Sequence, residues 1–324
     1  MSARHVPVLI IGSGPAGYTA AIYAARALLN PVIITGMEQG GQLMITTEVE
    51  NYPGYADPVQ GPWMMEQMRQ QAEHVGAEIV NDLVTSVDLD RRPFTVNTDS
   101  GAVWTCDALI IATGAQAKWL GIAGEKDFMG FGVSACATCD GFFYRGKHVI
   151  VVGGGNTAVE EAIYLANLAE KVTLVHRRDE LRSEKILQER LFALPNVEFL
   201  WNSELVEYIG GEPVGAMPPA VRAVRIKDRT SGETREMEID GVFVAIGHAP
   251  AVSLFKDKLR LKPNGYLWTA PDSAATEIPG VFAAGDVTDD IYRQAVTAAG
   301  MGCMAALEAE RFLAGIGTQA EAAE

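Results

Sequence analysis

The sequence predicts an α/β protein that contains two related units. Two glycine-rich turns, at Gly12–Gly17 and Gly153–Ala158, each follow a short apolar segment and precede a helix-like segment. Each turn is followed by a second apolar segment that ends in glycine, Asp107–Gly114 in the first unit and Asp240–Gly247 in the second. The first glycine and the closing glycine are 102 positions apart in the first unit (12 to 114) and 94 in the second (153 to 247). This spacing indicates two nucleotide-binding units and is far longer than the period of a solenoid repeat.

The composition of the 324-residue chain excludes several classes of protein. It carries 41 acidic against 26 basic side chains, a net charge of −15, which argues against non-specific binding to nucleic acid or to anionic membranes. Four cysteines in a chain of this length do not form the disulfide framework of a small secreted domain. No apolar run approaches the ~20 residues that span a membrane. We therefore expect a cytoplasmic protein without nucleic-acid or membrane partners.

The first glycine turn has the context of a dinucleotide site. Val6–Ile11 predicts a buried strand, and Gly12–Gly17 follows it as a full GxGxxG motif that opens a helix, which Asn30 and Pro31 end. Glycines at these positions allow a tight turn and a close approach of the backbone, so that a pyrophosphate can lie at the helix amino terminus. A glycine-rich loop without a ligand is the weaker alternative.

The segment after the next predicted strand, Val32–Thr35, leaves the recognition of the ribose open. An acidic residue is expected about twenty positions after the first glycine. The chain has Thr35–Glu38 there, followed by Gln39–Gln42. Either Glu38 binds the ribose from a slightly later position, or backbone groups of the loop replace it.

The second unit carries a cationic segment where an acid would select NAD. Val149–Val152 predicts its first strand, a helix is expected at about Asn156–Ala169, and Val172–Val175 predicts the next strand. His176–Arg178 follows about twenty residues after the first glycine, and Arg182 lies one turn further on. Cations at this point suit the 2′-phosphate of NADP, with a solvated basic patch as the alternative.

Two cysteines, Cys136 and Cys139, lie just before the second turn. If the stretch is helical, their α-carbons are roughly 5 Å apart on one face, within the range that a disulfide needs. The alternative is half of a zinc site, which requires two more ligands. Cys106 and Cys303 are isolated in apolar runs, so we expect redox chemistry and no metal.

Three further segments carry structural predictions. The stripe Trp63–Met68, at helical spacing, predicts core packing more than cofactor contact. Residues 210–219 predict an exposed loop between two hairpin strands, and a helix is expected from Arg293–Ala295 to about Leu313. The end of the chain, Thr318–Glu324, is expected to be disordered.

Taken together, these motifs resemble the low-molecular-weight, bacterial-type thioredoxin reductases, class II pyridine nucleotide-disulfide oxidoreductases, along nearly the whole chain. The motifs that carry the resemblance are GSGPAG at Gly12–Gly17, TGMEQGGQL at Thr35–Leu43, ACATCDGFFYRG at Ala135–Gly146, GGGNTAVEEA at Gly153–Ala162, HRRDELR at His176–Arg182 and GVFAAGDV at Gly280–Val287. The CATC-DGFFYRG run beside GGGNTA is specific, whereas a single GxGxxG is not.

The resemblance implies two Rossmann-like dinucleotide-binding domains, each a three-layer ββα structure. An NADPH domain, residues 116–245, would be inserted into an FAD domain formed by residues 1–115 and 246–324. The residues implied at FAD are Gly12, Ser13, Gly14, Pro15, Ala16, Gly17, Thr35, Gly36, Met37, Glu38, Gln39, Gly40, Gly41, Gln42, Asn51, Gly114, Asp286, Arg293, Gln294 and Ala295. The residues implied at NADPH are Gly154, Gly155, Asn156, Thr157, His176, Arg177, Arg178 and Arg182.

The resemblance also implies a reaction. Hydride passes from NADPH to FAD, the reduced flavin opens the Cys136–Cys139 disulfide, and the dithiol reduces the disulfide of thioredoxin. Cys139 would face the flavin and Cys136 would attack thioredoxin. Asp140 is the nearest acid in sequence and is the candidate proton donor; alternatively it satisfies a local backbone N–H.

The placement of the thiols in the second unit also implies a movement. Thiols and nicotinamide in one domain must reach the same flavin in turn, by a swing on linkers at Ala115–Lys118 and Gly247–Ala251. The family is typically homodimeric, so a homodimer is expected as well.

Other functions remain open at this point. The chain could be a flavin- and NADPH-binding redox sensor without turnover, or an NADPH-dependent reductase of another small disulfide protein. A reductase of a ferredoxin-like carrier needs no thiol pair, so Cys136 and Cys139 disfavour it. A layout like that of glutathione reductase would place the redox cysteines in the FAD unit, where the sequence has only Cys106 and Cys303.

Overall fold

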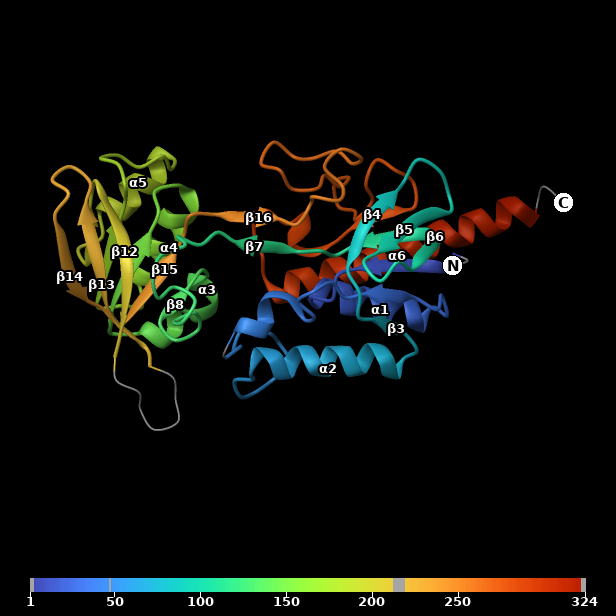
Figure 1. Ribbon diagram of the computed structural model, residues 1–324, viewed down its shortest axis with the longest axis horizontal. Coiled ribbons are helices and arrows are strands. Elements are labelled where there is room, and N and C mark those ends of the chain that lie inside the picture. The colour runs from blue at the N-terminus through green and yellow to red at the C-terminus, as the bar shows by residue number, and fades with distance from the viewer. Residues whose placement is uncertain (1–2, 47, 212–218, 322–324) are drawn as a thin grey trace. The chain divides into compact units, whose positions relative to one another are not determined.

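The computed structural model describes residues 3–46, 48–211 and 219–321 (Figure 1). The chain forms two compact units. Unit 1 consists of Met1–Gln116 and Ala249–Glu324, and unit 2 of Ala117–His248. Within the described residues, no helix is both long and apolar enough to cross a membrane.

Unit 1 is built on a sheet with strand order β3-β2-β1-β6-β5-β4, to which β17 adds by pairing with β6. The strands β3, β2, β1, β6 and β17 are parallel, whereas β4 and β5 join as an antiparallel extension. The central strands are buried on both faces, as their continuous apolar sequences predict. The strands are β1 (Arg4–Ile11), β2 (Val32–Ile34), β3 (Glu78–Val80), β4 (Val84–Asp88), β5 (Phe94–Thr98), β6 (Val103–Ile111) and β17 (Val281–Ala283).

Helices cover one face of this sheet. α1 (Pro15–Arg26) packs against both α2 (Gly61–His74) and α6 (Ala295–Glu321), and residues of all three join the core on that face. The methionines of α2 are in this core, since Met64, Met65 and Met68 are buried, and for them the core prediction is confirmed. Trp63 is exposed, so the prediction is wrong for that residue. The core on the opposite face also contains side chains of the antiparallel extension (β4 and β5) and of residues 252–267. Short 3-10 helices, η1 (Gly41–Ile45) and η3 (Gly285–Val287), lie at the ends of loops.

The carboxyl-terminal helix differs from its prediction. α6 continues past Leu313 to Glu321, so the prediction of disorder from Thr318 is wrong for residues 318–321. Gln319, Ala320 and Glu321, which are good helix formers, end this helix.

Unit 2 repeats the layered plan. A parallel sheet of order β11-β10-β9-β15-β8 has α3, α4 and α5 on one face and the antiparallel sheet β12-β13-β14 on the other. The predicted α/β fold of two three-layer ββα units is thus confirmed. The strands are β8 (Val133–Ser134), β9 (His148–Val152), β10 (Lys171–Val175), β11 (Val197–Leu200), β12 (Ser203–Gly210), β13 (Val221–Asp228), β14 (Thr234–Glu238) and β15 (Gly241–Val244). The helices are α3 (Ala137–Asp140), η2 (Gly141–Tyr144), α4 (Asn156–Ala166) and α5 (Lys185–Phe192).

The predicted loop at 210–219 connects β12 and β13, which are antiparallel partners as a hairpin requires. Most of that loop, residues 212–218, lies outside the described residues.

The chain passes between the units through two short strands that pair with each other (Figure 1). These are β7 (Ala115–Ala117) and β16 (His248–Pro250). The Lys118 amide donates to the Gly247 carbonyl at 2.9 Å, and the Ala251 amide donates to the Gly114 carbonyl at 3.0 Å. The two segments predicted as linkers therefore form one hydrogen-bonded ribbon.

A buried carboxylate organises the segment of unit 2 that precedes β8. Glu125 is 3% exposed. Its side chain accepts hydrogen bonds from the backbone amides of Leu120 (3.0 Å) and Gly121 (2.6 Å) and from the Tyr208 hydroxyl (3.2 Å). Since a buried carboxylate is stable only when it is hydrogen-bonded, these three donors hold the segment against β12.

Replacing Glu125 by alanine should destabilise the protein. The substitution leaves the buried Tyr208 hydroxyl and the two backbone amides without an acceptor, which should cost roughly 2–4 kcal/mol of unfolding free energy. Urea denaturation measures the change, with Glu170→Ala, at an exposed glutamate of the same unit, as the matched control. Equal midpoints for the two variants would contradict the role assigned to Glu125.

Candidate active site

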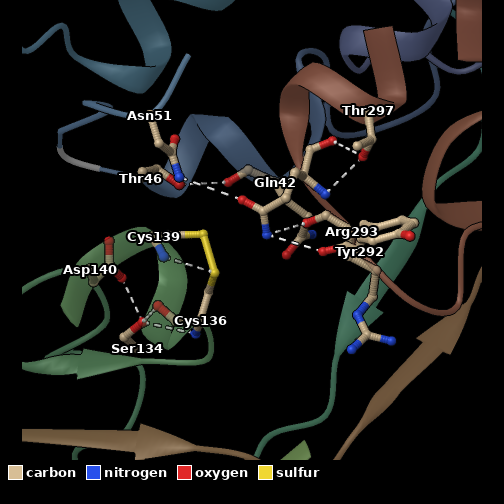
Figure 2. The surroundings of a disulfide bond; sticks show 11 residues. Gln42, Thr46, Asn51, Ser134, Cys136, Cys139, Asp140, Tyr292, Arg293 and Thr297 are labelled. Carbon is tan, nitrogen blue, oxygen red and sulfur yellow. Dashed lines mark hydrogen bonds between the residues drawn. A yellow bond between two sulfur atoms is a disulfide. The ribbon is translucent and has the colours of Figure 1, made fainter. Parts of the chain in front are cut away.

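The two cysteines of unit 2 form a disulfide (Figure 2). Cys136 and Cys139 have their α-carbons 5.3 Å apart. Cys136 is the N-cap residue of α3, and the Cys139 amide donates to its sulfur atom at 3.2 Å. A single helical turn therefore places the two sulfur atoms together, as the spacing of the cysteines predicts.

The disulfide-bearing turn is packed on α4. Ala137 is 1% exposed and belongs to the core that also contains the buried face of α4. Gly141 packs closely on α4, because a β-carbon there would lie 3.1 Å from side-chain atoms of both Leu165 and Tyr164. Since α4 begins directly after the second glycine turn, the disulfide and that turn share one support.

Asp140 lies beside the disulfide, and its carboxyl group is held by Ser134 (Figure 2). The Ser134 hydroxyl donates to Asp140 Oδ2 at 2.5 Å. Burial raises the pKa of Asp140, and the bond from Ser134 opposes that shift. Asp140 is the N-cap residue of η2 but makes no side-chain capping bond there, so the structure does not support the alternative of a local cap. Sequence reasoning missed Ser134, which carries no motif signal of its own.

The second glycine turn leaves the amino terminus of α4 open. Gly153 (φ +154°) lies against the chain, since a β-carbon there would be 2.4 Å from the Ala245 carbonyl oxygen. Gly155, the N-cap residue of α4, has no atom within 4 Å of its β-carbon position and provides no capping side chain. The free backbone N–H groups of the helix and its dipole can thus bind an anion.

His176 and the neighbouring arginines occupy different places. His176 is 4% exposed, and a β-carbon on Gly154 would lie 2.2 Å from its ring, so this histidine packs directly beneath the turn. Burial, together with Arg182, Arg178 and Arg177, lowers the pKa of His176. The three arginines are exposed, and within the described residues their guanidinium groups form no ion pair. They are therefore available to an anionic ligand. Asn156 accepts a hydrogen bond from the Glu184 amide at 3.0 Å, and Thr157 is half-buried.

The first glycine turn, in unit 1, has the same construction. Gly12 (φ +107°) approaches the chain so closely that a β-carbon would lie 2.2 Å from the Ala112 carbonyl oxygen. Gly14 is open and is the N-cap residue of α1, which begins at Pro15 and has no side-chain cap. The helix amino terminus is again free for a phosphate group.

Ser13 connects this turn to the loop that follows β2. Its hydroxyl donates to the Thr35 carbonyl at 3.0 Å and accepts from the Gly40 amide at 3.1 Å. The loop consequently returns to the turn, and a β-carbon on Gly41 would lie 3.5 Å from the Gly14 α-carbon. Glu38 is exposed, and its side chain makes no hydrogen bond within the described residues. The choice between Glu38 and backbone groups for the ribose therefore remains open.

The carboxyl-terminal segment of unit 1 joins the same site from a distant part of the sequence. A β-carbon on Gly285 would lie 2.8 Å from the Ala16 β-carbon, so η3 lies directly beside the first turn. The Asn51 amide donates to the Gln294 side chain at 3.5 Å across 243 positions of sequence. Figure 2 shows Asn51, Tyr292 and Arg293 in this part of unit 1.

Asp289, which sequence reasoning missed, shapes that segment. Its carboxylate accepts hydrogen bonds from the amides of Ile291, Tyr292 and Arg293 at 2.9–3.0 Å. Arg293 is held in the left-handed region (φ +49°). An aspartate two to four residues before these amides is the sequence signal of such a turn.

Asp286 has a buried oxygen atom without a partner. Its Oδ1 makes no hydrogen bond within the described residues. Burial raises the pKa of Asp286 to about 7, with a further contribution from Asp289, while Arg293 opposes the shift. An unsatisfied buried carboxyl oxygen beside the first glycine turn fits a ligand hydroxyl group.

Unit 1 thus has an open helix amino terminus with an unpartnered carboxyl oxygen near it, and unit 2 has a second open helix amino terminus, exposed arginines and a disulfide. No group of three His, Cys, Asp or Glu that could hold a metal ion occurs in the described part of the chain. Residues 6–302 match the family described as pyridine nucleotide-disulphide oxidoreductase. The chain belongs to this family.

Within the family, the chain is a member of the thioredoxin reductases. It is 60% identical over 306 residues to the thioredoxin reductase of Rickettsia bellii, covering 94% of this chain and 97% of that protein. It is 53% identical over 322 residues to the thioredoxin reductase of Escherichia coli O157:H7, covering 97% and 98%. The solved thioredoxin reductase of Giardia duodenalis matches the structure with a TM-score of 0.90 at 43% identity, covering 96% and 99%.

The raised pKa of Asp286 predicts a pH-dependent stability. In the unfolded chain the carboxyl group ionises near the ordinary aspartate pKa of 3.8, whereas in the fold it ionises only near 7. The flavin-free protein should therefore lose stability as the pH rises from about 4 to 7. The Asp286→Asn variant lacks this titration. Its unfolding free energy relative to that of the parent should therefore increase by roughly 1–4 kcal/mol when the pH is raised from 5 to 8.

Urea denaturation of the flavin-free protein at the two pH values measures this difference. Asp257→Asn, at an exposed aspartate of the same unit, is the control, and its effect should be equal at both pH values. If Asp286→Asn also had equal effects at pH 5 and pH 8, Asp286 would not be held in its neutral form by the fold.

Proposed function

We propose that this protein is an NADPH-dependent flavoenzyme that reduces the disulfide of thioredoxin. The observation that carries the proposal is the Cys136–Cys139 disulfide, which lies beside the buried carboxyl of Asp140 on a turn packed against the helix that begins at the second glycine turn. The relatives of similar length and high identity are named thioredoxin reductases, which favours thioredoxin over other small disulfide proteins.

FAD is the proposed ligand of residues 1–115 and 246–324, and NADPH that of residues 116–245. The open helix amino terminus at Gly14, the returning loop up to Gln42 and the unpartnered oxygen of Asp286 support the first assignment. The open turn at Gly155 and the unpaired arginines support the second. When bound, FAD supplies a two-electron carrier between a nicotinamide and a disulfide.

Asp140 is the proposed proton donor, and Cys136 and Cys139 carry out the thiol exchange. Two-electron reduction breaks the Cys136–Cys139 bond and leaves negative charge on sulfur, which a proton must neutralise. Burial keeps Asp140 protonated to a higher pH than an exposed aspartate, so its carboxyl is the proposed donor.

The dithiol then reduces the substrate in two exchanges. The Cys136 thiolate attacks one sulfur of the substrate disulfide, forms a mixed disulfide and expels the other sulfur as a thiolate. Cys139 next returns the proton to Asp140, and its thiolate attacks the Cys136 sulfur. This second step restores the Cys136–Cys139 disulfide and expels the second substrate sulfur as a thiolate. The two substrate thiolates take up two protons from solvent, which gives the dithiol.

We also propose that the NADPH domain rotates against the FAD domain between the two half-reactions. Both linkers lie in the β7–β16 ribbon, so a change of backbone torsions there would move the inserted domain as one body. A crosslink that joined the domains and left turnover intact would contradict this movement. The homodimer and the cytoplasmic location stay predictions.

Substitution of the redox cysteines tests the function. Cys136→Ser and Cys139→Ser should each lower NADPH-dependent thioredoxin reduction by roughly 1,000-fold or more, because no exchange can proceed without the pair. Stopped-flow absorbance should show that NADPH still bleaches the flavin and that thioredoxin no longer restores it. The control is Cys303→Ser, at the half-buried cysteine outside the pair. An unaltered parent that bleaches with NADPH and does not recover with thioredoxin would be a sensor and not this enzyme.

The arginines should determine the choice of pyridine nucleotide. Replacing Arg177, Arg178 or Arg182 by alanine removes a charge-assisted bond to the 2′-phosphate, so KM for NADPH should rise roughly 10-fold or more. KM for NADH, which lacks that phosphate, should not change. Steady-state kinetics with both nucleotides measures the ratio, with Arg190→Ala on α5 as the control. An equal rise for both nucleotides would show that the arginines act on the fold and not on the phosphate.

A further inference from the structure

Ser134 makes three contacts that connect the candidate proton donor to the redox disulfide (Figure 2). It is the last residue of β8 and is 7% exposed. Its hydroxyl oxygen lies 2.5 Å from Asp140 Oδ2, 3.1 Å from the Cys136 amide nitrogen and 3.5 Å from the Cys136 carbonyl oxygen. Within the described residues, no other side chain hydrogen-bonds to the Asp140 carboxyl.

The chemistry of these groups determines the direction of each bond. The Cys136 amide can only donate, so the Ser134 oxygen accepts from it. The single hydroxyl hydrogen of Ser134 then has two acceptors within reach, the Asp140 carboxylate and the Cys136 carbonyl. The bond to Asp140 is the shorter one and is charge-assisted while the aspartate is ionised.

Protonation of Asp140 reverses the direction of its hydrogen bond with the Ser134 hydroxyl. The carboxyl O–H then donates to the second lone pair of the Ser134 oxygen, and the serine hydrogen turns to the Cys136 carbonyl. Neither group loses its partner in either state. A residue that could only donate, or only accept, would leave Asp140 unsatisfied in one of them.

We propose that Ser134 is a positioning residue that keeps the Asp140 carboxyl fixed against the Cys136–Cys139 turn both before and after proton transfer. The proposal rests on the proposed function, in which Asp140 gives up a proton when the disulfide opens. Because Ser134 contacts the backbone of Cys136 as well, the acid and the attacking cysteine keep one geometry through the cycle.

No charged group contributes to the pKa shift of Asp140, so the titration of its carboxyl group reports on the bond from Ser134. Burial and the Ser134 bond are the two influences on its pKa, and they oppose each other. The Tyr144 hydroxyl on η2 faces the same region, and burial, together with Asp140 and Asp240, raises its pKa to about 12, so it stays neutral throughout the working range. The two sulfur atoms do not titrate while the disulfide is closed.

The test is an infrared titration of the protonated carboxyl band of Asp140 in the oxidised, FAD-loaded protein. The band is assigned by its loss in Asp140→Asn. Ser134→Ala removes a bond that favours the ionised form, so the titration midpoint should rise by about one pH unit or more. Ser134→Thr retains the hydroxyl and should return the midpoint to that of the parent.

Ser203→Ala is the matched control, because Ser203 is also 7% exposed in unit 2 and donates instead to the Trp201 carbonyl. Its midpoint should equal that of the parent. If Ser134→Ala is not recovered folded, Ser134→Gly removes the same hydroxyl without adding a thiol, and its midpoint should lie above that of the parent. A midpoint that stays unchanged in Ser134→Ala or Ser134→Gly would overturn the proposal.

Kinetics separate this role from a general loss of structure. In Ser134→Ala, kcat for thioredoxin reduction should fall roughly 10- to 100-fold, as expected for a displaced acid, with KM for NADPH unchanged. A fall in kcat with no change in the carboxyl midpoint would assign Ser134 a merely structural part. If Ser134→Ala shifted the midpoint but the parent did not reduce thioredoxin, the positioning role would stand and the proposed function would be refuted.

Discussion

Both glycine turns depend on one steric constraint, the contact between a glycine and a backbone carbonyl. Gly12 lies against the carbonyl of Ala112, and Gly153 against the carbonyl of Ala245; β-carbons at these glycines would be 2.2 and 2.4 Å from the oxygen atoms. In each unit the alanine stands two residues before the glycine that closes the second strand, Gly114 or Gly247. This contact allows the first strand to turn at once into its helix, so the helix amino terminus opens at the carboxyl edge of the sheet, where ligands of such folds bind.

The parts of the structure that could be predicted from the sequence are those that short segments determine. Apolar runs, the two glycine turns and the cysteine spacing each act within a few residues, so the strands, the helix starts and the disulfide follow from local rules. Contacts between distant segments could not be predicted in this way. Asn51 meets Gln294 across 243 positions, and His176 is buried beneath Gly154 although its neighbours Arg177 and Arg178 are exposed. These outcomes depend on packing, which no local pattern encodes.

Two aspartates with raised pKa values, one in each unit, differ in their hydrogen-bond partners. Burial raises the pKa of both Asp140 and Asp286. Asp140 has a partner within the chain, Ser134, which can satisfy it in either protonation state. Asp286 has an oxygen with no partner in the described residues, and its neutral form can both donate to and accept from a ligand hydroxyl. The arrangement of Asp140 suits a group that exchanges a proton. That of Asp286 suits a group that hydrogen-bonds to a bound ligand.

The disulfide and the second turn share one support, α4. α3 packs on α4 through Ala137 and Gly141, and α4 begins directly after Gly155. Under the proposed function, NADPH at the turn and the disulfide would thus share unit 2, and a flavin bound to unit 1 would take up the hydride and return the electrons to the disulfide.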